Sequence, residues 1–211
     1  MKTGKNDFKA KLPLILGGGG LALLFLALAL FWAFVWAPQR QKIVFPLRFE
    51  EEIRAAAGEF SVHPCLLAGL IYCESSFRPE IESAAGALGL TQIMPKTGEW
   101  LAEKIEIRDY EPSMLLDPAV NVRMGAWYLG YLLGRYGGRP REALTAYIAG
   151  QGQVDAWLED KNLSKDGLSL DEIPGKDVKE YAEKVLRAYA QYLEIYGDVL
   201  DPEHAFDGLL L

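Results

Sequence analysis

The chain has 211 residues, of which 50% are hydrophobic and 24% are charged, and its formal net charge is −7. This length allows one ordinary domain and an appendage, and the composition excludes a disordered chain, a collagen and a disulfide-dense scaffold. Without residues 1–37, which hold four lysines and one aspartate, 18 basic and 28 acidic residues remain and the net charge is −10. We therefore expect no nucleic-acid partner, because phosphate binding needs clustered Lys and Arg.

An apolar stretch without a single charge covers residues 12–37. A helix needs roughly 20 apolar residues to cross a membrane, so residues 1–37 are predicted to be a cytoplasmic tip and one transmembrane anchor. Four lysines precede the stretch and favour a cytoplasmic N-terminus, with the remaining chain on the outer face. The alternative is a signal peptide cleaved after residues 35–37. The length of the apolar region and the following Pro38 argue against cleavage.

Residues 38–49 are predicted to connect this segment to a mainly α domain over residues 50–196, with residues 197–211 as a tail. The expected helices cover residues 49–57, 64–77, 96–106, 117–136, 141–149, 153–158 and 177–196. Glycine or proline marks most of their ends. Residues 83–95 are expected to form turns around a short helix, and residues 162–174 a loop. No strand alternation is visible, which favours a compact all-α fold.

Two cysteines, Cys65 and Cys73, fall within one expected helix. Eight residues of helical rise place them ~12 Å apart, which is too far for a disulfide. We expect two small buried side chains instead. His63 and His204 complete no metal-ligand pattern with them, so the sequence predicts no metal site.

A carboxylate stands out on the helix expected at residues 64–77. Four apolar residues share one face of this helix by their spacing: Leu67, Leu70, Ile71 and Phe77. Glu74 falls on the same face, where a charge needs a partner or a function. Apolar neighbours and the helix C-terminus both raise a carboxyl pKa, as a general acid requires. The alternative is a structural glutamate that pairs with an arginine such as Arg78 or Arg123 or caps a neighbouring helix, and periodicity does not decide between this and a catalytic role.

The residues that follow Glu74 form ordered motifs. The first reads Glu74-Ser75-Ser76-Phe77-Arg78-Pro79, and the second reads Ser83-Ala84-Ala85-Gly86-Ala87-Leu88-Gly89-Leu90-Thr91-Gln92-Ile93-Met94-Pro95. Later elements are Asp117-Pro118-Ala119-Val120-Asn121-Val122, Ala146-Tyr147-Ile148-Ala149-Gly150 and Ile173-Pro174 with Asp177 and Tyr181. In this order and spacing, residues 50–196 closely resemble the lytic transglycosylases with a goose-lysozyme-like, or SLT, domain.

The resemblance implies a lysozyme-like helical fold and a role for each matching residue. Glu74 stands where the family has its catalytic acid. The positions that line the glycan cleft in the family match Ser83, Gln92, Met94 and Tyr147. For Met94 and Tyr147, the residues themselves leave ordinary core packing open as the alternative.

Two positions depart from the family pattern. Thr91 replaces the usual Met at what we expect to be a cleft-side position, a change that can alter sugar contacts. Ile148 replaces the Asn of the Ala-Tyr-Asn-Ala-Gly element and can neither donate nor accept a hydrogen bond. This second change leaves room for altered specificity or weak activity.

Most glycosidases use two carboxylates, but only Glu74 combines motif and placement here, because Asp117 is better explained as a helix N-cap. The resemblance implies a non-hydrolytic route on peptidoglycan strands, in which one acid suffices and no cofactor or metal is needed. The apolar stretch and its preceding lysines then predict a catalytic domain in the periplasm at the bacterial inner membrane, with any cell-envelope partner left open. The alternatives are a lysozyme-like hydrolase with an unrecognised second carboxylate and a glycan-binding scaffold of weak activity.

Overall fold

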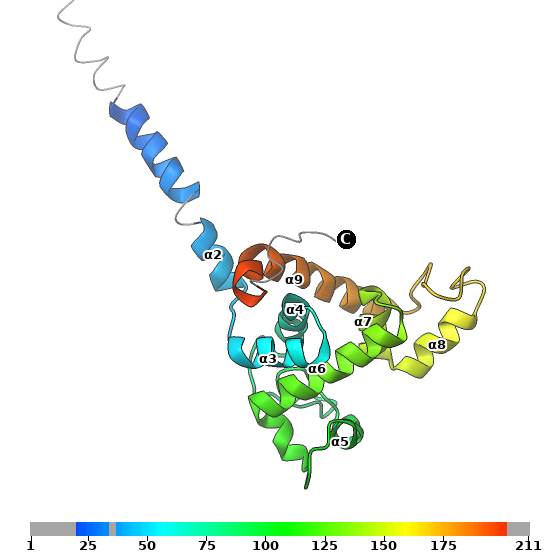
Figure 1. The fold of residues 1–211 in the computed structure, drawn as a ribbon. Helices are drawn as coiled ribbons and strands as arrows, with labels where there is room; N and C mark the ends of the chain where they lie inside the picture. The colour runs from blue at the N-terminus through cyan, green and yellow to red at the C-terminus, as the bar shows by residue number, and fades with distance from the viewer. Residues whose placement is uncertain (1–19, 34–36, 202–211) are drawn as a thin grey trace, which may run out of the picture. The chain divides into compact units, whose positions relative to one another are not determined.

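The computed structural model describes residues 20–33 and 37–201, and the chain divides into two compact units, residues 1–46 and 47–211. In the first unit, residues 20–33 are helical with exposed side chains, and α2 covers Ala37–Val44 (Figure 1). Among the described helices, none combines the length and the apolar character that a membrane crossing requires. Much of the predicted anchor lies outside the described residues.

The second unit is built from helices. They are α3 (Glu50–Phe60), α4 (Pro64–Ser75), α5 (Pro95–Lys104), the 3₁₀ helix η2 (Pro112–Leu116), α6 (Pro118–Arg135), α7 (Pro140–Ala149), α8 (Gln151–Glu159) and α9 (Lys176–Leu200). In the described part of the chain, β structure is limited to two isolated bridges, from Leu88 to Glu82 and to Ile93. The prediction of a mainly α domain is therefore confirmed.

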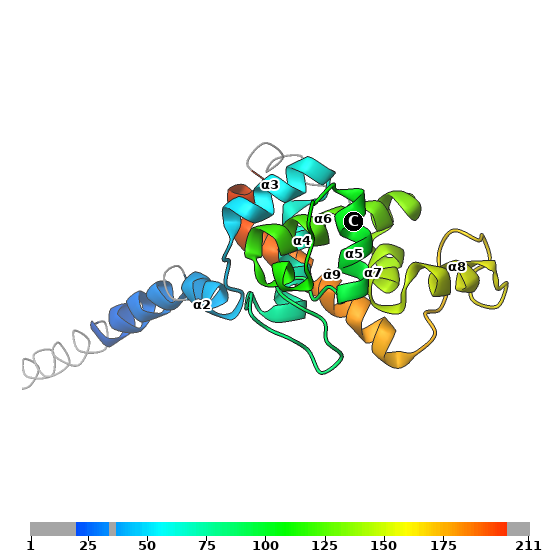
Figure 2. The ribbon, with the colours of Figure 1, turned by 90° about the horizontal axis from the view of Figure 1, so that it is seen from below.

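Helix α4 is the centre of this unit and packs on α3, α6 and α9. Both Figure 1 and Figure 2 show it between these helices. At Gly69 a Cβ atom would lie 2.8 Å from the main-chain nitrogen of Tyr189, so only glycine permits this approach of α4 to α9. Residues on every side of α4 are buried, and Leu66 and Ala68 are as inaccessible as the predicted apolar face. The helix is thus a core helix rather than an amphipathic one.

Helix α4 ends two residues earlier than predicted. Ser76 and Phe77 both have left-handed backbone, with φ of 51° and 59°, which stops the helix after Ser75. Phe77 is nevertheless fully buried, and its ring lies 6.0 Å from that of Tyr192 on α9. The prediction that Phe77 is buried is therefore confirmed, but Phe77 reaches the core from a turn rather than from the helix.

The expected short helix within residues 83–95 is wrong, because this segment consists of turns and the two isolated bridges. Gly86, Gly89 and Gln92 have φ of 83°, 77° and 52°, and a right-handed helix cannot contain such residues. We refer to residues 81–94 as the turn segment.

The other expected helices are confirmed with small shifts at their ends. Asp117 caps α6 as predicted, since its side chain accepts a hydrogen bond of 3.0 Å from the Val120 N–H. Helix α3 continues through Gly58 to Phe60, and α9 extends the closing helix to Leu200. The short helix η2 was not predicted.

Both cysteines are free thiols, as predicted. Burial raises the pKa of Cys65 to about 12 and that of Cys73 to about 11. The two thiols therefore stay protonated at neutral pH and are weak nucleophiles.

Candidate active site

Glu74 lies in the last turn of α4, where it faces α9. The Tyr181 hydroxyl of α9 donates a hydrogen bond to Oε1 of Glu74. Arg123 forms its ion pair with Glu59 instead, at 2.6 Å, and Arg78 donates to a main-chain carbonyl. The alternative of a structural Glu74 paired with one of these arginines is therefore contradicted.

The surroundings of Glu74 keep its carboxyl group largely protonated at moderately acidic pH. Burial raises its pKa from 4.5 to about 7, against the opposing effects of the Tyr181 hydrogen bond and the Lys184 charge. The expectation that apolar neighbours raise this pKa is thus supported. An acid of pKa near 7 can both give and take a proton at neutral pH.

Two tyrosines share the environment of Glu74. Burial and then the negative charge of Glu74 raise the pKa of both Tyr147 and Tyr181 well above 10. Their hydroxyl groups therefore remain neutral hydrogen-bond donors at all ordinary pH values. The site combines one titratable acid with fixed neutral dipoles.

Tyr147 of α7 connects three parts of the unit. Its hydroxyl donates a hydrogen bond of 2.9 Å to the main-chain oxygen of Thr91 in the turn segment. Its ring centroid lies 5.1 Å from that of Tyr128 on α6. Tyr147 is only partly buried, so it contributes to packing and keeps some surface for a ligand.

Ser83 and Gln92 shape the turn segment through their side chains. Ser83 Oγ accepts a hydrogen bond of 3.0 Å from the Ala87 N–H, which closes a turn. Gln92 Nε2 donates to the main-chain oxygens of Gly89 and Ile81, at 2.9 and 3.3 Å. Both side chains are partly exposed. Ser83 and Gln92 therefore stabilise the backbone of the turn segment and also keep some surface accessible to a ligand.

Thr91 corrects a prediction, because its side chain is fully buried rather than on the cleft side. Its Oγ1 donates to Oδ1 of Asn121 at 2.7 Å, and its N–H donates to the same oxygen at 2.8 Å. The Thr91 hydroxyl is therefore satisfied inside the protein by the amide of Asn121. Thr91 can therefore act on the surface of the turn segment only through the backbone that it fixes.

Asn121 and Tyr181 are the two residues whose roles sequence reasoning missed. Asn121 of α6 is fully buried, and its Nδ2 donates to the main-chain oxygens of Leu88 and Leu115, at 3.0 and 2.8 Å. We refer to Asn121 and Thr91 with these backbone groups as the Asn121 cluster. An amide four residues after the Asp117 cap, on the buried face of α6, was the available signal.

Met94 and Ile148 lie at the surface. Met94 precedes α5 and is 42% exposed, so the alternative of core packing is contradicted for this residue. Ile148 is 48% exposed beside Tyr147, so the departure from the family's Asn places an apolar group where solvent or a ligand meets the protein.

No group of three or more His, Cys, Asp or Glu side chains in residues 20–33 and 37–201 is arranged to hold a metal ion. His204 lies outside the described residues.

A partly buried acid of near-neutral pKa beside neutral tyrosines can give and take a proton, which is the property that general acid–base catalysis requires. Residues 51–168 match the family model "Transglycosylase SLT domain". The chain belongs to this family.

Curated relatives carry related names. The "Soluble lytic murein transglycosylase" of Escherichia coli strain K12 is 30% identical over 156 residues, covering 73% of this chain and 24% of that protein. The "Membrane-bound lytic murein transglycosylase C" of Histophilus somni is 35% identical over 91 residues, covering 42% of this chain and 25% of that protein. The chain thus spans about a quarter of the length of these relatives.

Solved structures show the same fold. An inactive mutant of the lytic transglycosylase Slt from Pseudomonas aeruginosa matches with a TM-score of 0.67 and 29% identity, covering 74% of this chain and 25% of that one. The 70 kDa soluble lytic transglycosylase of Escherichia coli matches with the same TM-score and 27% identity, covering 74% and 26%. The prediction of a lysozyme-like SLT domain is confirmed.

Proposed function

We propose that this protein is a peptidoglycan lytic transglycosylase in which residues 50–196 form the catalytic domain and Glu74 is the catalytic acid. The observation that carries the proposal is the partly buried Glu74, with a pKa of about 7, within the fold of this family. The Pseudomonas relative described as inactive has glutamine in place of a glutamate, which agrees with a reaction that depends on one carboxyl group.

In the proposed reaction, Glu74 gives its proton to the oxygen that links N-acetylmuramic acid to N-acetylglucosamine. The bond from the muramic C1 to this oxygen breaks, and the substrate's N-acetyl group stabilises the positive charge that develops on the ring. Glu74, now a carboxylate, takes the proton of the sugar's own 6-hydroxyl, whose oxygen bonds to C1. The product carries a 1,6-anhydro end, and no water is consumed.

The surroundings of Glu74 suit both halves of this cycle. A pKa of about 7 lets the group be an acid in the first step and a base in the second. The Tyr181 hydroxyl supplies a donor to the carboxylate form, so the charge left after the first proton transfer keeps a hydrogen bond. Glu74 is the one carboxylate that the motifs assign to the site, which agrees with the transglycosylase route, whereas most glycoside hydrolases use two carboxylates.

We assign the glycan cleft to Ser83, Gln92, Met94 and Tyr147. Ser83 and Gln92 hold the backbone of the turn segment and stay partly exposed, while Met94 offers an exposed apolar surface. Tyr147 lies near enough to Glu74 for that charge to raise its pKa. Ile148 beside it is expected to replace a polar sugar contact of the family with an apolar one.

We further propose that residues 1–37 anchor the enzyme to the bacterial inner membrane by one helix, with residues 38–49 as connector and residues 197–211 as tail. The catalytic domain then faces the periplasm, beside its substrate. The charge-free stretch of residues 12–37 and the four preceding lysines support this arrangement. The name of the Histophilus relative, a membrane-bound transglycosylase, agrees with it.

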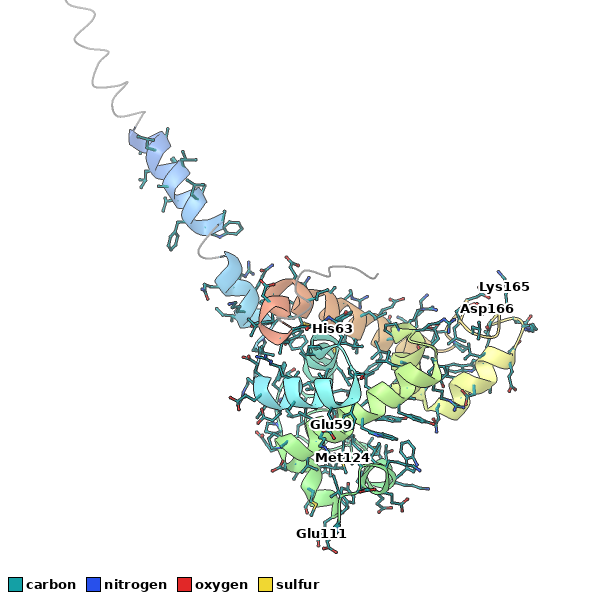
Figure 3. All side chains as sticks on the ribbon, in the orientation of Figure 1. Glu59, His63, Glu111, Met124, Lys165 and Asp166 are labelled. Carbon is teal, nitrogen blue, oxygen red and sulfur yellow. The ribbon has the colours of Figure 1, made fainter. Side chains whose placement is uncertain are left out.

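The deciding experiment incubates the full chain, kept in detergent, with purified peptidoglycan and identifies the soluble fragments by mass spectrometry. We expect 1,6-anhydro ends, and a loss of at least about 100-fold in Glu74→Gln, which cannot supply the proton. Glu59→Gln is the matched control, because Glu59 lies on α3 in an ion pair with Arg123 (Figure 3).

The products separate the proposal from its alternatives. Reducing ends would identify a hydrolase, and glycan binding without release would identify a scaffold. Undiminished release by Glu74→Gln would remove this residue from the mechanism.

A further inference from the structure

A row of aromatic side chains on α5 and α6 plays no part in the proposed chemistry. Trp127 and Tyr131 of α6 lie parallel, with ring centroids 5.4 Å apart and planes at 3°. Trp100 of α5 meets both edge-on, at 5.4 and 5.6 Å, and lies 6.0 Å from Tyr128 of α6. We call these four residues the aromatic platform.

The platform has a buried side and an accessible side. Trp100, Trp127 and Tyr128 pack on an apolar cluster that includes the fully buried Met124 (Figure 3). All four platform residues are nevertheless only partly buried, so part of each ring meets solvent. Trp127 and Tyr131 are one helical turn apart, which places their rings side by side on one face of α6.

The platform is continuous with the candidate active site. The ring of Tyr128 lies 5.1 Å from that of Tyr147, which in turn lies near Glu74 and donates to Thr91. Successive rings therefore lead from the acid across Tyr147 and Tyr128 to Trp100, each within 6.0 Å of the next. These ring contacts place the aromatic platform beside the candidate active site.

We propose that the aromatic platform is a further glycan-binding subsite, which holds sugar units of the strand remote from the bond that Glu74 cleaves. This inference rests on the proposed function. Sugar rings present C–H faces that pack on aromatic rings, and Tyr hydroxyl and Trp N–H groups donate to their oxygens.

Charge favours this occupant as well. The chain without residues 1–37 carries a net charge of −10, so attraction to an anionic wall polymer cannot come from its overall field. Packing of sugar rings on neutral aromatic faces is a source of affinity that does not depend on that field. The rigid Trp and Tyr rings also lose little side-chain entropy when a ligand packs on them.

The test measures binding by calorimetry with the full chain in detergent, carrying Glu74→Gln so that the ligand survives. The ligands are a single peptidoglycan disaccharide and strands several disaccharides long. Trp127→Ala is expected to weaken binding of long strands about tenfold and to leave disaccharide binding unchanged, because only long strands reach the platform. Trp127→Phe keeps a ring and should retain most of the affinity.

Two further variants guard against a folding defect. Tyr131→Leu keeps an apolar side chain but removes the ring, and should weaken binding of long strands with an unchanged melting temperature. Leu193→Ala removes an exposed apolar side chain on α9 and should change neither ligand's affinity.

The inference is overturned if long strands bind no better than the disaccharide, or if the platform variants weaken both ligands equally. It is also overturned if Trp127→Ala leaves binding unchanged but converts a dimer into a monomer in sedimentation, because the platform is then a self-association surface. Mass spectrometry on the unsubstituted enzyme separates this outcome from a failure of the proposed function. Anhydro products without a length effect remove only the subsite, whereas a length effect without anhydro products removes only the activity.

Discussion

Tyr147 lies near two groups of polar side chains, the Asn121 cluster and Glu74, which differ in how completely their polar atoms are hydrogen-bonded. In the Asn121 cluster the side-chain amide of Asn121 donates two hydrogen bonds and accepts two, and both Asn121 and Thr91 are fully buried. At Glu74 one tyrosine hydroxyl donates to the carboxyl group, while burial raises its pKa to about 7. A buried polar group with all its partners stabilises a fold, whereas one with few partners changes its protonation instead.

The Asn121 cluster and the Glu74 region have different roles in the site. The Asn121 cluster ties the turn segment to α6 and to η2, which fixes the backbone on which Gln92 and Met94 lie. Gly89 permits this, since a Cβ atom there would overlap Leu115 and Asn121. The Glu74 region is left less completely satisfied, which is the property that a general acid requires.

The largest effect is expected from breaking the Asn121 cluster. Asn121→Leu removes the acceptor of the Thr91 N–H and hydroxyl and the amide donor to the Leu115 carbonyl, while the Leu88 carbonyl keeps the Ile93 N–H, so we expect the free energy of unfolding to fall by about 3–5 kcal/mol. Urea denaturation followed by circular dichroism measures this. Thr91→Val, which removes only the hydroxyl, should cost about 1 kcal/mol. A loss below that value in Asn121→Leu would show that the cluster does not hold the segment.

Glu74→Gln is expected to stabilise the protein at alkaline pH. The folded state holds the Glu74 proton up to about pH 7, whereas an unperturbed glutamate loses its proton near pH 4.5. The stabilisation that comes from this raised pKa is therefore fully present below pH 4.5 and is lost as the pH rises through 7. Glutamine does not titrate, so the variant should gain at most about 3 kcal/mol over the unsubstituted protein between pH 4 and pH 8, from 1.36 kcal/mol per pKa unit.

Glu59→Gln provides a control of opposite sign for this measurement. Arg123 lowers the pKa of Glu59, so removing that carboxylate should reduce stability at pH 8 rather than increase it. Equal pH dependence in Glu74→Gln and the unsubstituted protein would contradict the raised pKa.

Tyr181→Phe is expected to have an intermediate effect on stability and to leave Glu74 with still fewer hydrogen bonds than Asn121. The variant loses the donor to Glu74, at a cost of about 0.5–1.5 kcal/mol in unfolding free energy. Because this hydrogen bond lowers the pKa of Glu74, its loss should move the alkaline limb of the pH–activity profile to higher pH. Peptidoglycan release measured across the pH range tests this, and a limb moved to lower pH would contradict it.

Lys184→Met is expected to have the smallest effect. Lys184 is exposed on α9, where its Nζ donates to the Cys73 carbonyl at 3.3 Å, and its charge lowers the pKa of Glu74. Removing the charge should move the same alkaline limb to higher pH, but by less than Tyr181→Phe. Salt screens exposed charges, so the difference should shrink at high ionic strength. A shift that persists in high salt would require another cause.

The sequence predicted the helices because their signals are local. Asp117 and Pro118 start α6, and Pro64 starts α4, where helix-favouring dihedral angles and caps need only neighbouring residues. The same reasoning failed in the turn segment, where a short helix was expected. Left-handed backbone at Gln92 is not readable from the residue type, because the hydrogen bonds of its own turn stabilise it.

The site residues likewise divide into those that local motifs identify and those whose contacts depend on distant residues. The motifs identified Glu74, Ser83, Gln92, Met94 and Tyr147 as candidates. They did not reveal that Thr91 is buried, because its partner Asn121 lies 30 residues away in the sequence. Nor did they identify Tyr181 as the donor to Glu74, from 107 residues away.

The sequence alone determined an acidic, mainly helical domain after a long apolar stretch, and one glutamate in an apolar setting with the motifs of a family. These are properties of composition and of neighbouring residues. The pKa of that glutamate, its tyrosine partner and the position of Thr91 were decided only by the tertiary structure. Desolvation and hydrogen bonding depend on which distant helices pack against a residue, and here α9 and α6 close around α4 and the turn segment.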